Sequence, residues 1–126
     1  MSYMQEDFLL KTETAKRLYH EYAKDMPIFD YHCHLPEKQI GENKPFKDIC
    51  EVWLGGDHYK WRLMRNYGVN ERYITGEATN REKFTAYCKT LSTAFGNPLY
   101  HWSQAELKAF FHCEKEINEE NAEAIW

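Results

Sequence analysis

The chain has 126 residues, of which 43% are hydrophobic, 29% charged and 16% aromatic, and its formal net charge is −4. This length and composition indicate one globular domain with a hydrophobic core, and they exclude collagen-like and disordered chains. The acidic balance argues against a nucleic-acid or anionic-membrane partner. No apolar run approaches the ~18–20 residues of a transmembrane helix.

The opening residues and the cysteines indicate a reducing compartment. The first ten residues contain Glu6 and Asp7 but no basic segment or apolar run, so we expect no secretory signal. The four cysteines are widely spaced, without a Cys-x-x-Cys pair, and are Cys33, Cys50, Cys88 and Cys113. We therefore expect reduced, mostly buried thiols in a cytoplasmic protein.

The first third of the chain predicts a helix and then a strand. Residues 12–26 repeat apolar side chains at helical spacing, which predicts an amphipathic helix that Pro27 ends. Residues 28–34, Ile-Phe-Asp-Tyr-His-Cys-His, are short, apolar and aromatic, which predicts a buried strand. No other segment is a good strand candidate, so the predicted fold class is mainly α with one short strand.

Capping residues predict helices from residue 48 onward. Asp48 begins a short helix that ends at Leu54, and Asp57 begins a second that runs through Tyr67, with Gly68 in the position of a terminating glycine.

Two capping boxes follow later in the chain. The box at residues 79–82 opens a helix to about Phe95, and residues 97–98, Asn-Pro, begin a turn that is typical of a helix start. A second box at residues 103–106 predicts a further helix start, and residues 119–126 have helical character.

His32 and His34 carry the clearest chemical pattern. Alternate side chains of a strand point to one face, so both imidazoles would face the same way and Cys33 the other way. Two such imidazoles can bind one divalent ion such as zinc, and the carboxyl end of a barrel strand would open onto an active-site face. The alternative is a pair of structural, hydrogen-bonded histidines, and this short pattern does not decide between them.

A second group of polar residues begins the helix after Asp57. His58 and Tyr59 can each transfer a proton or bind a substrate. His58, Arg62 and Arg65 are spaced to share one helix face, which could meet a carboxylate. The simpler alternative is a helix that packs its aromatic side chains in the core and leaves its charges in water.

These segments resemble the uronate isomerases of the amidohydrolase superfamily. Residues 28–35 resemble their first barrel strand, and the match continues through residues 56–62, Gly-Asp-His-Tyr-Lys-Trp-Arg, and residues 96–102, Gly-Asn-Pro-Leu-Tyr-His-Trp. The resemblance covers nearly the whole chain, and residues 56–62 are far more specific than a His-x-His pair. A (β/α)8 barrel takes about 250 residues, so the chain cannot contain a whole one. The enzymes of this family are several times longer than this chain, so the resemblance implies that the chain corresponds to about their N-terminal quarter.

The resemblance implies a metal-dependent (β/α)8 barrel, to which residues 1–35 contribute a helix and the first strand and residues 36–126 an inserted helical domain. The implied reaction is aldose–ketose isomerisation of D-glucuronate to D-fructuronate and of D-galacturonate to D-tagaturonate. It implies that His32 and His34 are the metal ligands, with zinc as the expected ion. His58 and Tyr59 are implied to bind the substrate, and Tyr59 also to transfer a proton.

Two other functions stay open, a metal-dependent hydrolase of the same superfamily and a helical binding domain without activity. The expected partner is a small hexuronate, without nucleic acid or membrane, and a homo-oligomer is left open. We expect the 126 residues alone neither to hold metal tightly nor to isomerise uronates. We also expect residues 28–34 to self-associate or lose order when detached from neighbouring strands, and the helices from Asp48 onward to form their own core.

Overall fold

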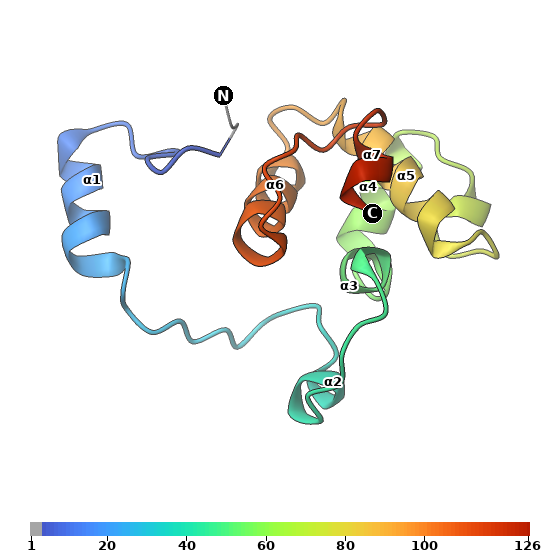
Figure 1. Cartoon of the computed structure of the whole chain (residues 1–126), viewed down its shortest axis with the longest axis horizontal. Coiled ribbons are helices and arrows are strands. Elements are labelled where there is room, and N and C mark those ends of the chain that lie inside the picture. Colours follow the sequence, from blue (N-terminus) through green and yellow to red (C-terminus); the bar gives the residue numbers. More distant parts are fainter. Residues whose placement is uncertain (1–3) are drawn as a thin grey trace. The chain divides into compact units, whose positions relative to one another are not determined.

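A computed structural model describes residues 4–126, which are mainly helical (Figure 1). The chain divides into two compact units, one that ends at Cys33 and one from His34 to Trp126. Residues 1–3, part of the N-terminal segment considered above, lie outside the described part. Within residues 4–126 no helix is long and apolar enough to cross a bilayer.

The first unit contains α1, Glu13–Leu18, which continues as a π-helical turn η1, Tyr19–Ala23. Thr12 caps α1, because its hydroxyl accepts a hydrogen bond from the backbone N–H of Ala15 at 3.1 Å. The helix predicted over residues 12–26 is therefore confirmed, although it is shorter and ends in a wider turn.

The strand predicted at residues 28–34 is wrong for this chain. These residues have irregular backbone, and no strand occurs anywhere in residues 4–126. The side chains of Ile28, Phe29 and Tyr31 are 92%, 93% and 94% exposed. A strand is held by hydrogen bonds to a neighbouring strand, and no described segment supplies one, so the apolar pattern alone does not produce a strand.

The second unit holds the remaining helices, which are α2 Glu37–Gly41, α3 Ile49–Leu54, α4 His58–Asn66, the 3-10 turn η2 Glu71–Tyr73, α5 Asn80–Leu91, α6 Pro98–Phe111 and α7 Ala122–Ile125. The predicted helix starts at Asp48, Asp57, Thr79 and Asn97 are confirmed, because each side chain accepts a backbone N–H of the first turn that follows. Gly68 has a φ of +88°, the left-handed conformation expected of a glycine that ends α4.

Two predicted boundaries differ from the structure. The helix α5 ends at Leu91 rather than near Phe95. The second capping box is wrong, because α6 begins at Pro98 and passes through residues 103–106 without interruption. Ser103 is completely buried there and bonds to another side chain instead of capping a helix.

The core of the second unit lies among α3, α4 and α5. The ring of Trp53 lies 5.9 Å from those of both Phe84 and Tyr87, and Met64 is fully buried. Trp126 packs against this core, with its ring centroid 5.6 Å from that of Phe84. These contacts confirm the prediction that the helices from residue 48 onward form a core of their own.

Candidate functional site

The site is built at the start of α4. The glycines at residues 55–56 separate α3 from α4, and Asp57 follows in an extended conformation with φ −85° and ψ 93°. Its carboxylate accepts the backbone N–H groups of Tyr59 and Lys60 at 3.0 and 3.4 Å. This cap makes His58 and Tyr59 the first residues of the helix, and both side chains are exposed.

His34 lies against this helix start. Its ring centroid is 5.1 Å from that of His58 and 5.2 Å from that of Tyr59, with the Tyr59 ring stacked at 23°. The His58 and Tyr59 rings are 4.5 Å apart. The structure therefore brings together three of the four predicted site residues in one cluster.

His32 belongs to the other unit. Its side chain is exposed and its backbone N–H donates to the Asp30 carboxylate at 3.2 Å. Within residues 4–126 no group of three or more His, Cys, Asp and Glu side chains is arranged to hold a metal ion. The two imidazoles predicted as ligands are also fewer than the three protein ligands typical of a catalytic zinc site.

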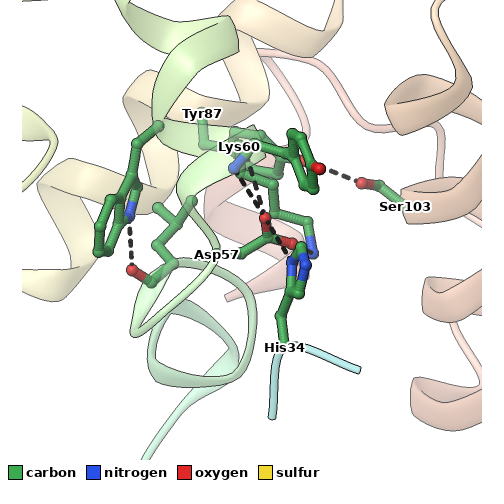
Figure 2. A network of polar contacts seen from close by, with 8 residues as sticks. His34, Asp57, Lys60, Tyr87 and Ser103 are labelled. Atoms are coloured by element: carbon green, nitrogen blue, oxygen red, sulfur yellow. Dashed lines mark hydrogen bonds and ion pairs between the residues drawn. The ribbon is translucent and has the colours of Figure 1, made fainter. Parts of the chain in front are cut away.

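Asp57 connects His34 to a buried lysine (Figure 2). Nδ1 of His34 lies 3.1 Å from Oδ1 of Asp57, and Nζ of Lys60 lies 3.2 Å from Oδ2. The Lys60 ammonium also lies 5.9 Å from the centroid of the buried Trp53 ring. The carboxylate thus has a hydrogen-bond partner on one oxygen and a cation on the other.

Opposing effects set the charge of this carboxylate. Burial alone would raise the pKa of Asp57, but the positive charge of Lys60 and the hydrogen bonds from His34 and Lys60 bring that pKa below its ordinary value. Asp57 is therefore ionised at neutral pH and can only accept hydrogen bonds. The hydrogen between Asp57 and His34 accordingly belongs to Nδ1 of the imidazole, so Nε2 is the ring nitrogen on the side away from the carboxylate. A metal could use that nitrogen, so His34 fits the role of an imidazole ligand.

The arginines on α4 have other partners. Arg62 lies over the Tyr59 ring, 5.2 Å from its centroid. Arg65 makes two hydrogen bonds to Glu71, at 2.9 and 2.6 Å. The hypothesis that Arg65 joins His58 to meet a substrate carboxylate is therefore weakened, since Arg65 already holds a carboxylate.

Sequence reasoning missed the second role of Asp57 and the role of Lys60. Asp57 was predicted only as a helix cap, and Lys60 was not singled out. The spacing of Asp57 and Lys60, three residues apart across a helix start, is the sequence feature that could have indicated this ion pair.

The chain is similar to known proteins along its whole length. A family model described as glucuronate isomerase matches residues 1–126. The uronate isomerase of Caldicellulosiruptor bescii is 60% identical over 124 residues, which are 98% of this chain and 27% of that protein. The uronate isomerase of Bacillus subtilis is 58% identical over 98% of this chain and 26% of its own length.

A solved structure is similar as well. The crystal structure of a uronate isomerase from Thermotoga maritima matches with a TM-score of 0.92 at 48% sequence identity, over 100% of this chain and 28% of that chain. The chain therefore spans little more than a quarter of the length of the relatives it matches.

Proposed function

Because the chain belongs to the glucuronate isomerase family, we propose that the longer protein to which it corresponds interconverts D-glucuronate with D-fructuronate and D-galacturonate with D-tagaturonate. One structural observation carries the proposal beyond the family match. The rings of His34, His58 and Tyr59 gather at the capped start of α4, although His34 is separated from the other two along the chain.

Isomerisation of a uronate moves a proton between C2 and C1 and passes through an enediol, so the site needs groups that hold or transfer protons near the sugar oxygens. Tyr59 suits this role, because its side chain is 47% exposed and so can reach a substrate. His58 lies beside it and can hydrogen-bond a sugar hydroxyl. We assign substrate binding to both residues and proton transfer to Tyr59.

We assign the metal to His32 and His34, with zinc as the expected ion. When bound, a divalent ion polarises sugar oxygens and stabilises the negative charge that develops on them. The orientation of His34 supports this assignment, because its Nδ1 faces the Asp57 carboxylate, as the second ring nitrogen of a metal-binding histidine usually does. We assign the remaining ligands and the catalytic carboxylate to other parts of the longer protein.

The intact protein is proposed to be a (β/α)8 barrel in which residues 1–35 supply a helix and the first strand and residues 36–126 an inserted helical domain. The exposed side chains of Ile28, Phe29 and Tyr31 support this, because a strand inside the barrel would bury them. A cytoplasmic location suits the buried thiols of Cys50 and Cys88. The proposed partner is the hexuronate alone, with a homo-oligomer left open.

The test uses the full-length protein with D-glucuronate and D-galacturonate, with ketose formation as the measurement. Tyr59→Phe should lower kcat by about 10²–10⁴-fold, as expected for loss of a proton-transfer group. His32→Ala should lose both activity and bound metal. Tyr67→Phe is the matched control, because Tyr67 is similarly exposed but caps the other end of α4.

Two results would contradict the proposal. Full-length protein that turns over neither uronate would overturn it, and hydrolysis of amides or lactones would then favour a hydrolase of the superfamily. Turnover unaffected by Tyr59→Phe would remove Tyr59 from its assigned role. The 126 residues alone should be inactive, because they supply only two of the proposed ligands.

A further inference from the structure

One carboxylate, that of Asp57, contacts both His34 and the first turn of α4. Oδ1 of Asp57 faces Nδ1 of His34 at 3.1 Å and accepts the backbone N–H of Tyr59 at 3.0 Å. Oδ2 faces the ammonium of Lys60 at 3.2 Å (Figure 2). A shift of this carboxylate would therefore move the His34 ring and the first turn of α4 relative to each other.

Asp57 is itself held in place by the core. Its side chain is 14% exposed and that of Lys60 is 9% exposed. Lys60 in turn lies over Trp53, which is 1% exposed and packed against Phe84 and Tyr87. A charged pair this well shielded from water has few alternative positions, because either charge left alone there would be costly.

We propose that Asp57 is a positioning residue, which holds the ring of His34 in one orientation and tautomer and aligns it with His58 and Tyr59. The inference rests on the proposed function, since it concerns the same site. Asp57 touches neither metal nor substrate in this role and acts through the imidazole. Carboxylates that orient ligand histidines in this way typically contribute about 10–100-fold to metal affinity.

The cap and the contact to His34 can be separated by mutation. Asp57→Ser keeps a side chain that caps helices well, but its hydroxyl is too short to reach both His34 and Lys60. Asp57→Asn keeps the length and an oxygen that can cap, but loses the charge that pairs with Lys60. The matched control is Asp48→Ser, because Asp48 caps α3 and also bonds a second side chain, that of Asn80 at 2.9 Å.

The experiment measures three properties of the full-length protein and these variants. The first is zinc affinity, by competition with a chelator. The second is the pair of ¹⁵N chemical shifts of His34 in metal-free, histidine-labelled protein, which distinguish an Nδ1–H from an Nε2–H imidazole. The third is kcat and KM for each uronate. His34→Gln identifies the His34 signals in the spectra.

Asp57→Ser should bind zinc about 10–100-fold more weakly than wild type. Its His34 signals should move from the Nδ1–H form to a mixture of tautomers, and kcat should fall more than KM rises. The zinc affinity and the share of Nδ1–H tautomer of Asp57→Asn should lie between those of wild type and Asp57→Ser. This second variant keeps the test informative if the serine variant does not fold. Asp48→Ser should leave zinc affinity and the His34 tautomer as in wild type.

The proposal is overturned if Asp57→Ser or Asp57→Asn keeps wild-type zinc affinity and the Nδ1–H tautomer, or if Asp48→Ser produces the same losses. Failure of the proposed function gives a different result, since wild-type protein would then not turn over uronates. The tautomer of His34 would still report on Asp57 in that case, because it is read without metal or substrate.

Discussion

Tyr87 on α5 and Ser103 on α6 share a hydrogen bond of 2.9 Å between their hydroxyl oxygens, and neither side chain is exposed to water (Figure 2). The two residues are 16 positions apart in the chain. Burial raises the pKa of the Tyr87 phenol, so this hydroxyl keeps its proton at any ordinary pH. The pair thus joins two helices inside the core without an unpaired hydroxyl on either side.

Removing one hydroxyl should destabilise the second unit. Tyr87→Phe leaves the Ser103 hydroxyl buried without this partner, which should lower the free energy of unfolding by about 1–3 kcal/mol. Urea unfolding of the 126-residue chain measures it. The double variant Tyr87→Phe with Ser103→Ala should lose less than the sum of the two single variants, because no orphaned group remains. Additive losses would show that the bond contributes nothing beyond packing.

The same pair explains one error of the sequence analysis. The Ser-x-x-Glu pattern at residues 103–106 matches a capping box as well as the Thr-x-x-Glu pattern at residues 79–82 does. Only the pattern at residues 79–82 forms a cap. A capping box consists of hydrogen bonds within four residues, whereas the Ser103 hydroxyl bonds to Tyr87 on another helix. Local patterns predicted four helix starts correctly and failed where a long-range contact decided.

In the candidate site, too, local patterns were predictable from the sequence and long-range contacts were not. His58 and Tyr59 are adjacent in sequence, so their joint position at a helix start was predictable from the cap at Asp57. The chain between His34 and Asp57 contains α2, an irregular segment and α3, and no periodic pattern encodes the contact between the two residues. The strand expected at residues 28–34 failed for a related reason, since a strand depends on a partner that lies elsewhere.

The capping box of α5 gives a second stability prediction. The Thr79 hydroxyl accepts the backbone N–H of Glu82, and the Glu82 carboxylate accepts the backbone N–H of Thr79 at 2.8 Å. Thr79→Ala should lower the free energy of unfolding by about 1 kcal/mol, whereas Thr79→Ser should leave the free energy of unfolding nearly unchanged. Thermal unfolding followed by circular dichroism measures both, and equal midpoints for the two variants would contradict the assignment of the cap.

Phe84 provides a test of the core. It is completely buried, and its ring contacts those of Trp53 and Trp126. Phe84→Ala should cost about 3–5 kcal/mol, because it removes a large apolar side chain and leaves a cavity. Phe110→Ala is the control, since Phe110 is 75% exposed and should change stability by less than about 0.5 kcal/mol. Comparable losses in urea unfolding for both variants would place the core elsewhere.

The Arg65–Glu71 pair gives a prediction about pH. The two hydrogen bonds from Arg65, and a further one from the Thr75 hydroxyl, lower the pKa of Glu71 to about 2. Because this pKa lies below that of the unfolded chain, ionised Glu71 stabilises the fold at neutral pH, and that contribution is lost as the pH falls from the ordinary glutamate range through about 2. The wild-type chain should therefore lose stability more steeply over this interval than Glu71→Gln.

The carboxyl ¹³C shift of Glu71, followed from pH 6 downward, measures this pKa directly. The titration midpoint should lie near 2 in the wild-type chain and return toward the ordinary value of about 4.3 in Arg65→Gln. Arg72→Gln is the matched control, because it removes an equal charge nearby while Arg72 is paired with Glu77 instead. A midpoint in the ordinary range for the wild-type chain would show that the hydrogen bonds from Arg65 do not lower the pKa of Glu71. An equal shift in both variants would show that this pKa responds to the general charge of the surface.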